Sequence, residues 1–303
     1  MPKQGKKMVL VTGATGKQGG ATLRHLRQRG IEVRALTRDP DTPEARRLVG
    51  RGTEVVRGDF DDQASLTRAL DGVWGAYAVQ TSRQEGGAEA EVRQGVGFAD
   101  AAKRSRISHL VYSSVGSADR NTGIPHFDSK GRIEEHIRGT GLRYTILRPV
   151  FFMENWMSMR AGIEQGTLHT PLRPDTRLQM IAVDDIGAFA AMAFEHPGHW
   201  QDRTLELAGD DLSMAEIAKA FTLVLGREVR YEQVPWDRFE QQAGGEMTVM
   251  WKWFEEVGYH IDIPAVRREY PSLMAFDRWL HANWKTVPGE RAVSGAGGGS
   301  GQV

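Results

Sequence analysis

The chain lacks three features that would each define a class of protein: cysteine, net charge and long apolar runs. With no cysteine among 303 residues, disulfide frameworks, thiolate metal sites and cysteine nucleophiles are excluded. Lysine plus arginine, 39, equals aspartate plus glutamate, 39, which argues against a nucleic-acid partner. No run approaches the ~20 apolar residues of a membrane-spanning helix, and Met8–Val11 is too short for a signal peptide. We therefore expect a cytoplasmic globular protein.

The sequence also lacks the motifs of several enzyme classes. None of its nine histidines forms an H-E-x-x-H pair, so we predict no metal site. There is no G-x-S-x-G elbow and no Walker loop, which removes the support for a hydrolase or a kinase.

Glycine, by contrast, is abundant at 35 residues, and many glycines lie where short apolar runs give way to amphipathic stretches. This alternation predicts an α/β fold, a doubly wound parallel sheet of the Rossmann type, which binds ligands at the carboxyl ends of its strands. The predicted strands are 8–11, 33–36, 55–56, 73–79, 110–112 and 144–147, and the predicted helices are 18–29, 43–49, 63–70, 88–103 and 130–138.

We predict three regions along the chain. Residues 1–150 form the Rossmann-type domain, and residues 151–288 form a smaller α/β lobe for a substrate or partner, interleaved with the first. That lobe has a helical pattern at 213–225 and a short strand at 229–231. Residues 289–303 have almost nothing to bury and predict a flexible Gly/Ser-rich tail.

The segment between the first strand and the first helix reads VTGATGKQGG. In that context its glycines predict a pyrophosphate site: the first permits a tight turn, the second lets the backbone approach the phosphates, and the third lets the helix pack closely. The spacing is G-x-x-G-x-x-G rather than the commoner G-x-G-x-x-G. The loop positions predicted to bind the cofactor are Gly13, Ala14, Thr15, Gly16, Lys17, Gln18 and Gly19.

The ends of the next strands supply further candidates. The second strand ends in Thr37 and Arg38, where an NAD site usually carries an acid, so Arg38 favours NADP(H); the alternative is a surface arginine paired with Asp39. After the third strand, Asp59 and Phe60 lie where the adenine would bind.

The end of the fourth strand and the start of the helix before it carry further polar residues. Gln80 and Thr81 would lie near the nicotinamide ribose, although the polarity of a turn explains them equally well. Asp62 is better read as the N-cap of the next helix than as a ligand residue.

These segments, with HFDSKG at 126–131 and RPVFFMEN at 148–155, resemble the NmrA-like family of atypical short-chain dehydrogenase/reductases. The resemblance implies a Rossmann domain that binds NADP(H), in a family of redox-sensing regulators and reductases of quinones and similar acceptors. It also implies a segment that closes over the nicotinamide. The residues it assigns there are Phe152, Met153, Glu154 and Asn155.

The family's typical relatives use a Tyr-x-x-x-Lys motif, whose tyrosine moves the proton that accompanies hydride transfer. Here the spacing puts His126 at the tyrosine position and keeps Lys130. Lys130 either binds the nicotinamide ribose or is a solvent-facing helix lysine. His126 either donates a proton or is only a turn residue. Ser113 and Ser114 follow the fifth strand, where the family's serine would be.

Two aromatic and methionine-rich segments have open roles. Residues 151–159 either line an apolar acceptor pocket or fill the core, and residues 247–254 either pack on the domain or form a surface for another chain.

Two hypotheses for the function follow from these observations. In the first, the protein is a non-catalytic sensor that reads NADPH against NADP⁺ and acts through a regulatory protein partner; His126 in place of tyrosine motivates it. In the second, it is an NADPH-dependent reductase of a small apolar or aromatic acceptor, such as a quinone, that takes hydride directly. The sequence leaves the acceptor, the partner and the oligomeric state open.

Overall fold

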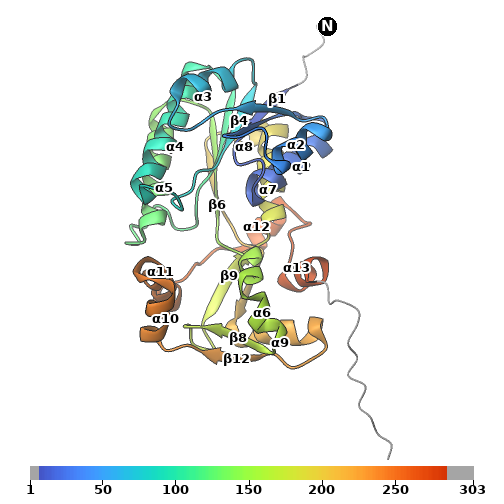
Figure 1. The fold of residues 1–303 in the computed structure, drawn as a ribbon, viewed down its shortest axis with the longest axis vertical. Helices are drawn as coiled ribbons and strands as arrows, with labels where there is room; N and C mark the ends of the chain where they lie inside the picture. Colours follow the sequence, from blue (N-terminus) through green and yellow to red (C-terminus); the bar gives the residue numbers. More distant parts are fainter. Residues whose placement is uncertain (1–6, 285–303) are drawn as a thin grey trace, which may run out of the picture.

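The computed structural model describes residues 7–284, and its larger part is a seven-stranded parallel sheet (Figure 1). Strand β1 (Met8–Val11) lies between β2 (Glu32–Thr37) and β4 (Gly75–Ala78), so the strand order reverses there. Such a reversal creates the crevice in which doubly wound sheets bind ligands. In spatial order the strands are β3 (Glu54–Arg57), β2 (Glu32–Thr37), β1 (Met8–Val11), β4 (Gly75–Ala78), β5 (His109–Ser113), β6 (Tyr144–Pro149) and β10 (Arg203–Leu207).

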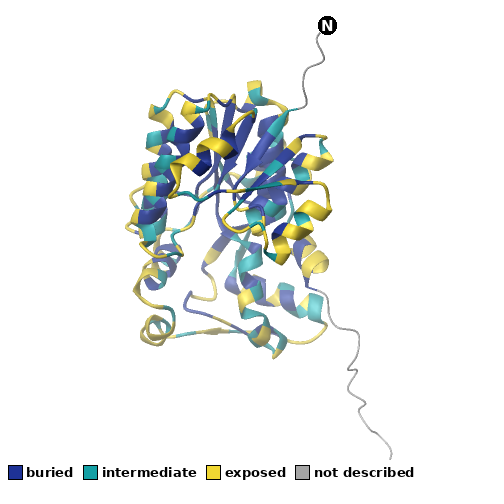
Figure 2. Cartoon of the chain, turned by 45° about the horizontal axis from the view of Figure 1, so that its top comes forward, coloured by how far each residue is buried: buried dark blue, intermediate teal, exposed yellow. Residues whose placement is uncertain are grey.

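Helices cover both faces of this sheet because its strands are apolar on both sides. Along β1, Leu10 enters one core while Val9 and Val11 enter the other, as expected for side chains that alternate across a strand. Strands appear dark blue at the centre of Figure 2. The helices of one face are α3 (Gln63–Leu70), α4 (Gly87–Arg104) and α5 (Pro125–Gly139), and those of the other include α1 (Lys17–Gln28), α2 (Pro43–Gly50) and α7 (Val183–Glu195).

The predicted fold class is confirmed, and the first six predicted strands are β1 to β6. Asp62 is the N-cap of α3, because its carboxylate accepts hydrogen bonds from the backbone of Ala64 and Ser65. Several boundaries differ by one or two residues, such as the strand predicted at 73–79, which is β4 (Gly75–Ala78). The helix predicted at 130–138 begins earlier, at Pro125, because a proline fits the first helical turn. His126 and Lys130 therefore lie one turn apart on the same helix.

The chain after residue 150 forms the smaller lobe, but two of its elements, β10 and α7, belong to the larger sheet and its helix layer. Strand β10 pairs with β6, and α7 packs on α1 so closely that a Cβ on Gly187 would lie 2.8 Å from the Cβ of Ala21. The predicted tail, 289–303, lies outside the described residues. Within the described range, 7–284, no helix is long and apolar enough to cross a membrane.

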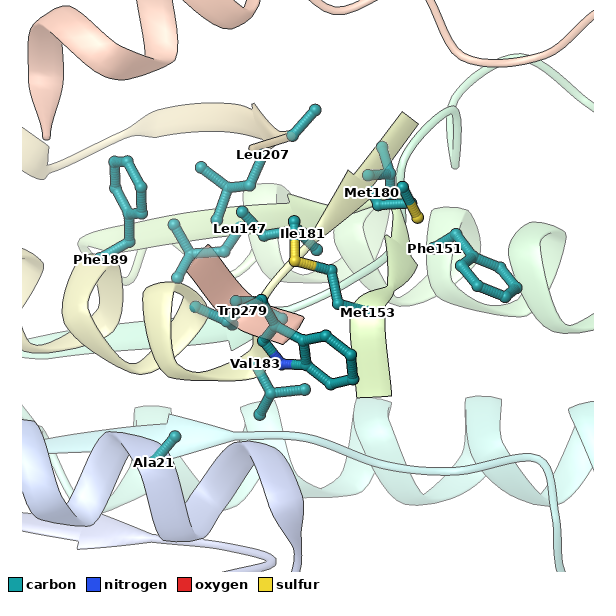
Figure 3. Packing of buried hydrophobic residues seen from close by; sticks show 14 of the residues in the cluster. Ala21, Leu147, Phe151, Met153, Met180, Ile181, Val183, Phe189, Leu207 and Trp279 are labelled. Carbon is teal, nitrogen blue, oxygen red and sulfur yellow. The ribbon is translucent and has the colours of Figure 1, made fainter. Parts of the chain in front are cut away.

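The smaller lobe contains two small sheets and several short helices (Figure 1). One core cluster runs from Ala21 of α1 and Leu147 of β6 to Phe151, Met180 and Trp279 of this lobe, so the two parts share buried contacts (Figure 3). Its elements are β7 (Phe151–Phe152), η1 (Met153–Met159), α6 (Arg160–Glu164), β8 (Thr167–Thr170), β9 (Arg177–Ile181), β11 (Asp210–Ser213), α9 (Met214–Leu225), β12 (Arg230–Gln233), α10 (Trp236–Ala243), α11 (Gly245–Glu256), α12 (Ile263–Glu269) and α13 (Phe276–Asn283), while α8 (Pro197–Trp200) follows α7.

Candidate functional site

A cavity of about 1160 Å³ lies at the carboxyl ends of the large sheet's strands. The loop after β1 and the ends of β2, β3 and β4 form one wall, and η1, α10 and α11 form the other. This is where a doubly wound sheet is expected to bind its ligand. The predicted site residues that line the cavity are Gly13, Thr15, Gly16, Lys17, Gln18, Gly19, Arg38, Asp59, Phe60, Gln80, Thr81, His126, Lys130, Phe152, Glu154 and Asn155.

The glycine loop is compact enough to bring backbone N–H groups to the cavity. Gly13 has a φ of +60°, a conformation that L side chains rarely adopt, and its carbonyl accepts a hydrogen bond from the Gly16 N–H at 2.9 Å. A Cβ on Gly19 would lie 2.3 Å from that carbonyl oxygen. Gly16 is the N-cap of α1 and no side chain caps this helix, so its N-terminal N–H groups remain suited to phosphate oxygens.

Hydrogen bonds from neighbouring strands hold this loop in place. The backbone N–H of Val79, at the end of β4, donates to the Thr12 hydroxyl at 2.9 Å. The Gln18 amide oxygen accepts from the hydroxyls of Ser113, at 2.6 Å, and Tyr77, at 3.3 Å. Burial raises the pKa of Tyr77 to about 12. Ser113 therefore supports the loop rather than lining the cavity.

Arg38 lies at the end of β2 with its side chain exposed at the cavity. Within the described residues no acid pairs with it, and Asp39 lies 3.9 Å from Arg57 instead. The surface ion pair with Asp39 that would explain Arg38 without a ligand is therefore absent from this arrangement. A free guanidinium suits a phosphate, which is consistent with the predicted preference for NADP(H).

The adenine end of the predicted site is only partly shaped by side chains. Asp59 accepts a hydrogen bond from the backbone of Asp61, at 2.9 Å, and Phe60 packs edge-on against Phe98. Thr81 accepts one from the backbone of Arg83, at 3.1 Å. All three predicted residues line the cavity, but each is also part of a local turn or core contact.

Gln80 is the lining residue whose surroundings most directly suit a polar ligand. Its side chain is 5% exposed and lines the cavity, yet neither its amide nitrogen nor its amide oxygen has a hydrogen-bond partner. A buried amide without partners costs roughly 1 to 3 kcal/mol per polar group, so it is expected to be satisfied by a ligand or by water. The residues present therefore fit a polar cofactor group at the end of β4.

Lys130 is held by a buried ion pair rather than facing solvent. Its ammonium donates to the carboxylate of Glu91 at 2.8 Å and to the carbonyl oxygen of Gln80 at 3.3 Å. Glu91, on α4, is fully buried and also accepts from the Ser129 hydroxyl at 2.6 Å. Nothing in the sequence singled out Glu91, because it lies in a helix rich in charged residues.

His126 lies at the rim of the cavity and also has a carboxylate partner. Its Nδ1 lies 2.7 Å from the carboxylate of Glu246, in the first turn of α11. Such a carboxylate fixes the imidazole tautomer and leaves the second ring nitrogen for another partner. His126 thus links the Rossmann part of the molecule to the smaller lobe.

The opposite wall of the cavity is apolar and comes mainly from α10 and α11. Trp251 and Phe254 are buried in the core and also line the cavity, so the segment 247–254 packs on its own chain. Of the segment 151–159, Trp156 is buried away from the cavity. Apolar lining residues of this wall include Phe151, Phe152, Met159, Phe239, Ala243, Met247, Met250, Trp251, Phe254 and Tyr259.

Three predicted cofactor residues have structural surroundings that differ from the expectation. Ala14 and Met153 are buried in the core and do not line the cavity. Glu154 lines it, but its carboxylate accepts hydrogen bonds from the Val183 backbone and the Trp279 indole at 3.0 to 3.2 Å. Burial raises the pKa of Glu154. These hydrogen bonds tie η1 to α7 and α13.

Ser114 also has a structural partner. Its hydroxyl donates to Glu134 at 2.5 Å, and Glu134 forms a buried ion pair with Arg148. Across residues 7–284, no group of three or more His, Asp or Glu side chains is arranged to hold a metal ion.

The fold and the cavity together define a Rossmann-type protein of the kind that binds a dinucleotide. The chain belongs to the NmrA-like family, whose model matches residues 5–280. It is 29% identical to an NAD(P)H azoreductase of Xenophilus azovorans over 78% of this chain and 81% of that protein.

Solved structures with the same fold include both enzymes and a regulator. An NADPH-dependent quinone oxidoreductase of Escherichia coli, complexed with NADPH, has a TM-score of 0.79 at 22% identity, over 92% of this chain and 100% of its own. NmrA, a negative transcriptional regulator, in complex with NADP, has a TM-score of 0.76 at 23% identity, over 92% and 95%. The predicted cofactor, NADP(H), is the one in these complexes.

Proposed function

We propose that this protein is an NADPH-dependent reductase of flat, conjugated acceptors such as quinones. The observation that carries the proposal is the construction of one cavity from two unlike walls. The glycine loop, Arg38 and Lys130 face it from the sheet, and aromatic and methionine side chains of α10 and α11 face it from the smaller lobe. A cavity of about 1160 Å³ exceeds the few hundred Å³ that a small ligand needs, so it has room for a cofactor and an acceptor together.

Each polar residue has a defined part in holding the cofactor. The N-terminus of α1 would bind the pyrophosphate, Arg38 the 2′-phosphate, and Lys130 the nicotinamide ribose. Gln80 would satisfy its buried amide on the same ribose or on the carboxamide. When bound, NADPH supplies a hydride, that is, two electrons and one proton, to the acceptor.

The apolar wall would orient the acceptor, because aromatic and methionine side chains adapt to flat conjugated molecules. A quinone takes hydride directly to give a hydroquinone anion, whose oxygen then takes a proton from water or from His126. A simple ketone is more demanding, because its oxygen needs a positioned acid as hydride arrives. The site offers no tyrosine at position 126, so we expect quinones to react and simple ketones to react poorly.

Anaerobic mixing of the protein with NADPH and matched panels of quinones and ketones tests the proposal through the loss of the reduced-nicotinamide absorbance. We expect turnover with quinones and near-background rates with ketones. NADPH binding without turnover of any quinone would contradict the reductase and would favour the sensor, a protein that binds NADPH and NADP⁺ and signals to a partner.

Variants of His126 separate hydride transfer from protonation of the acceptor oxygen. We expect His126→Phe to leave quinone reduction within a few-fold of the wild type and His126→Tyr to raise ketone reduction, since general acid catalysis contributes about 10² to 10⁴-fold. Ketone turnover by the wild-type protein that His126→Phe abolishes would instead make His126 a working acid.

A further inference from the structure

The buried carboxylate of Glu91 contacts Lys130, the lysine at the centre of the site. Glu91 is fully buried on α4, and an unpaired charge in such a place costs several kcal/mol. It is paired through both oxygens, with the Lys130 ammonium at 2.8 Å and the Ser129 hydroxyl at 2.6 Å. Ser129 and Lys130 are consecutive residues of α5, so one acid fixes this turn of the helix.

The contacts of the Lys130 ammonium leave room for one more acceptor. An ammonium group has three N–H bonds. One is directed to Glu91 and one to the carbonyl oxygen of Gln80, at 3.3 Å. The side chain is 13% exposed and lines the cavity, and its nitrogen lies 5.9 Å from the centre of the Tyr112 ring. The third N–H is thus the one available to a ligand.

We infer that Glu91 is a positioning residue, which holds the Lys130 ammonium so that its remaining N–H meets the ribose of the bound cofactor. The inference rests on the proposed function, because it assigns Lys130 the cofactor's ribose as its third partner. A flexible lysine would lose side-chain freedom on binding, and a lysine fixed beforehand binds more tightly for that reason. Glu91 also lines the cavity, but both of its carboxylate oxygens are already paired, with Lys130 and with Ser129.

The alternative is that Glu91 only joins α4 to α5, and the chain offers a matched control for it. Glu134, on α5, is also fully buried and pairs with a cation, Arg148, at 2.6 Å. It does not line the cavity itself, although the Ser114 hydroxyl that donates to it does. Glu134→Gln therefore reproduces the loss of a buried ion pair without touching Lys130.

The test measures NADPH dissociation constants by calorimetry for wild type, Glu91→Gln, Lys130→Met, the double variant and Glu134→Gln. In Glu91→Gln a neutral amide replaces the carboxylate. Lys130 therefore loses its ionic partner even when the amide oxygen faces it, whereas the Ser129 hydroxyl can accept a hydrogen bond from the amide NH2. We expect about tenfold weaker NADPH binding in Glu91→Gln. The double variant should bind no more weakly than Lys130→Met alone, because Glu91 acts through Lys130.

Glu134→Gln should lower the melting temperature and leave the NADPH affinity unchanged. In Glu91→Gln the KM for the acceptor should stay the same. Fully multiplying effects in the double variant, or an equal loss of affinity in Glu134→Gln, would overturn the inference. Failure of wild type to reduce any quinone while these affinities behave as expected would overturn the proposed reductase alone. If Glu91→Gln proves too unstable, Glu91→Asp keeps the charge and shortens the side chain, so it should still weaken NADPH binding. Unchanged NADPH affinity in Glu91→Asp would overturn the inference.

Discussion

The two walls of the cavity are built by different means. The wall from the large sheet consists of loops that follow consecutive strands, and its geometry is set by backbone, as at Gly13 and Gly19. The wall from α10 and α11 consists of side chains such as Met247 and Trp251, from helices that lie more than a hundred residues later in the chain. We expect changes in the first wall to act in an all-or-none manner on the cofactor, and changes in the second to act gradually on the acceptor.

The largest effect is expected at Gly16, in the backbone-built wall. Its φ of −93° and ψ of −174° suit a β-branched residue, and a Cβ there would meet only the Gly13 oxygen, at 3.3 Å. We therefore expect Gly16→Val to fold but to abolish binding of both NADPH and NADH, because the side chain occupies the pyrophosphate space. Calorimetry measures binding and circular dichroism the fold.

A valine at Gly139, where a Cβ has no neighbour within 4 Å, is the control for Gly16→Val and should bind normally. A folded Gly16→Val protein that binds NADPH as the wild type does would place the phosphates elsewhere. Gly19 sharpens the contrast: a Cβ there would clash with backbone, so Gly19→Ala should lose stability as well as binding.

The difference between the walls also explains what the sequence could predict. The glycine loop, Arg38 and the pair His126 and Lys130 follow from short-range spacing, and the structure brings all of them to one cavity. Glu91 does not follow, because α4 carries two similar acids two positions apart. Glu89 pairs with Arg132 at the surface, whereas Glu91 is buried. Only the packing of α4 against α5 decides between them.

The apolar wall was equally hard to predict, for the same physical reason. Met247 and Trp251 have the helical spacing of a core-facing stripe, and the sequence leaves open what that stripe covers. The partner of His126, Glu246, belongs to the same helix and is 120 positions away. Long-range contacts of this kind depend on the topology of the small lobe, which no local pattern encodes.

The next largest effect is expected at Arg38, where a side chain rather than the backbone would bind the cofactor. A charge-assisted hydrogen bond contributes ~1.5 to 3 kcal/mol, so Arg38→Ala should weaken NADPH roughly ten- to a hundredfold and leave NADH nearly unchanged. Calorimetry with both cofactors checks this. Arg57→Ala, at an exposed arginine of β3 outside the cavity, is the control. Equal losses for the two cofactors would mean that Arg38 does not bind the 2′-phosphate.

A smaller effect concerns the start of α7, where the two parts of the molecule meet. Burial raises the pKa of Asp185 to about 6 from an ordinary 3.8, and its carboxylate accepts a hydrogen bond from the Met274 backbone at 2.9 Å. Because the folded pKa is raised, this group's favourable contribution is complete below pH 4 and is lost as the pH rises through 6. Asp185→Asn should therefore gain stability relative to wild type, by about 1 to 3 kcal/mol, between pH 4 and pH 7.5.

Urea denaturation at the two pH values measures this change, and parallel behaviour of variant and wild type would show that Asp185 does not titrate in this range. For the neighbouring Asp184, the stability is expected to depend on pH in the opposite direction. A hydrogen bond with His25, and then one from Arg24, lowers the pKa of Asp184 to about 2. Asp184→Asn should lose stability at pH 7.5, and that loss should shrink as the pH falls below about 4.

The smallest effect is expected in the apolar wall, at Met247. This half-buried side chain lines the cavity from α11, so Met247→Ala removes apolar contact with the acceptor without touching the glycine loop. A loss of roughly 0.8 kcal/mol per buried methylene, only part of which faces the acceptor, predicts a quinone KM raised about three- to tenfold. The NADPH dissociation constant should be unchanged. Val249→Ala, on the exposed side of the same helix, should change neither value. An NADPH dissociation constant raised as much as the quinone KM in Met247→Ala would contradict this assignment. The apolar wall would then bind the cofactor as well as the acceptor, and α11 would belong to the cofactor site.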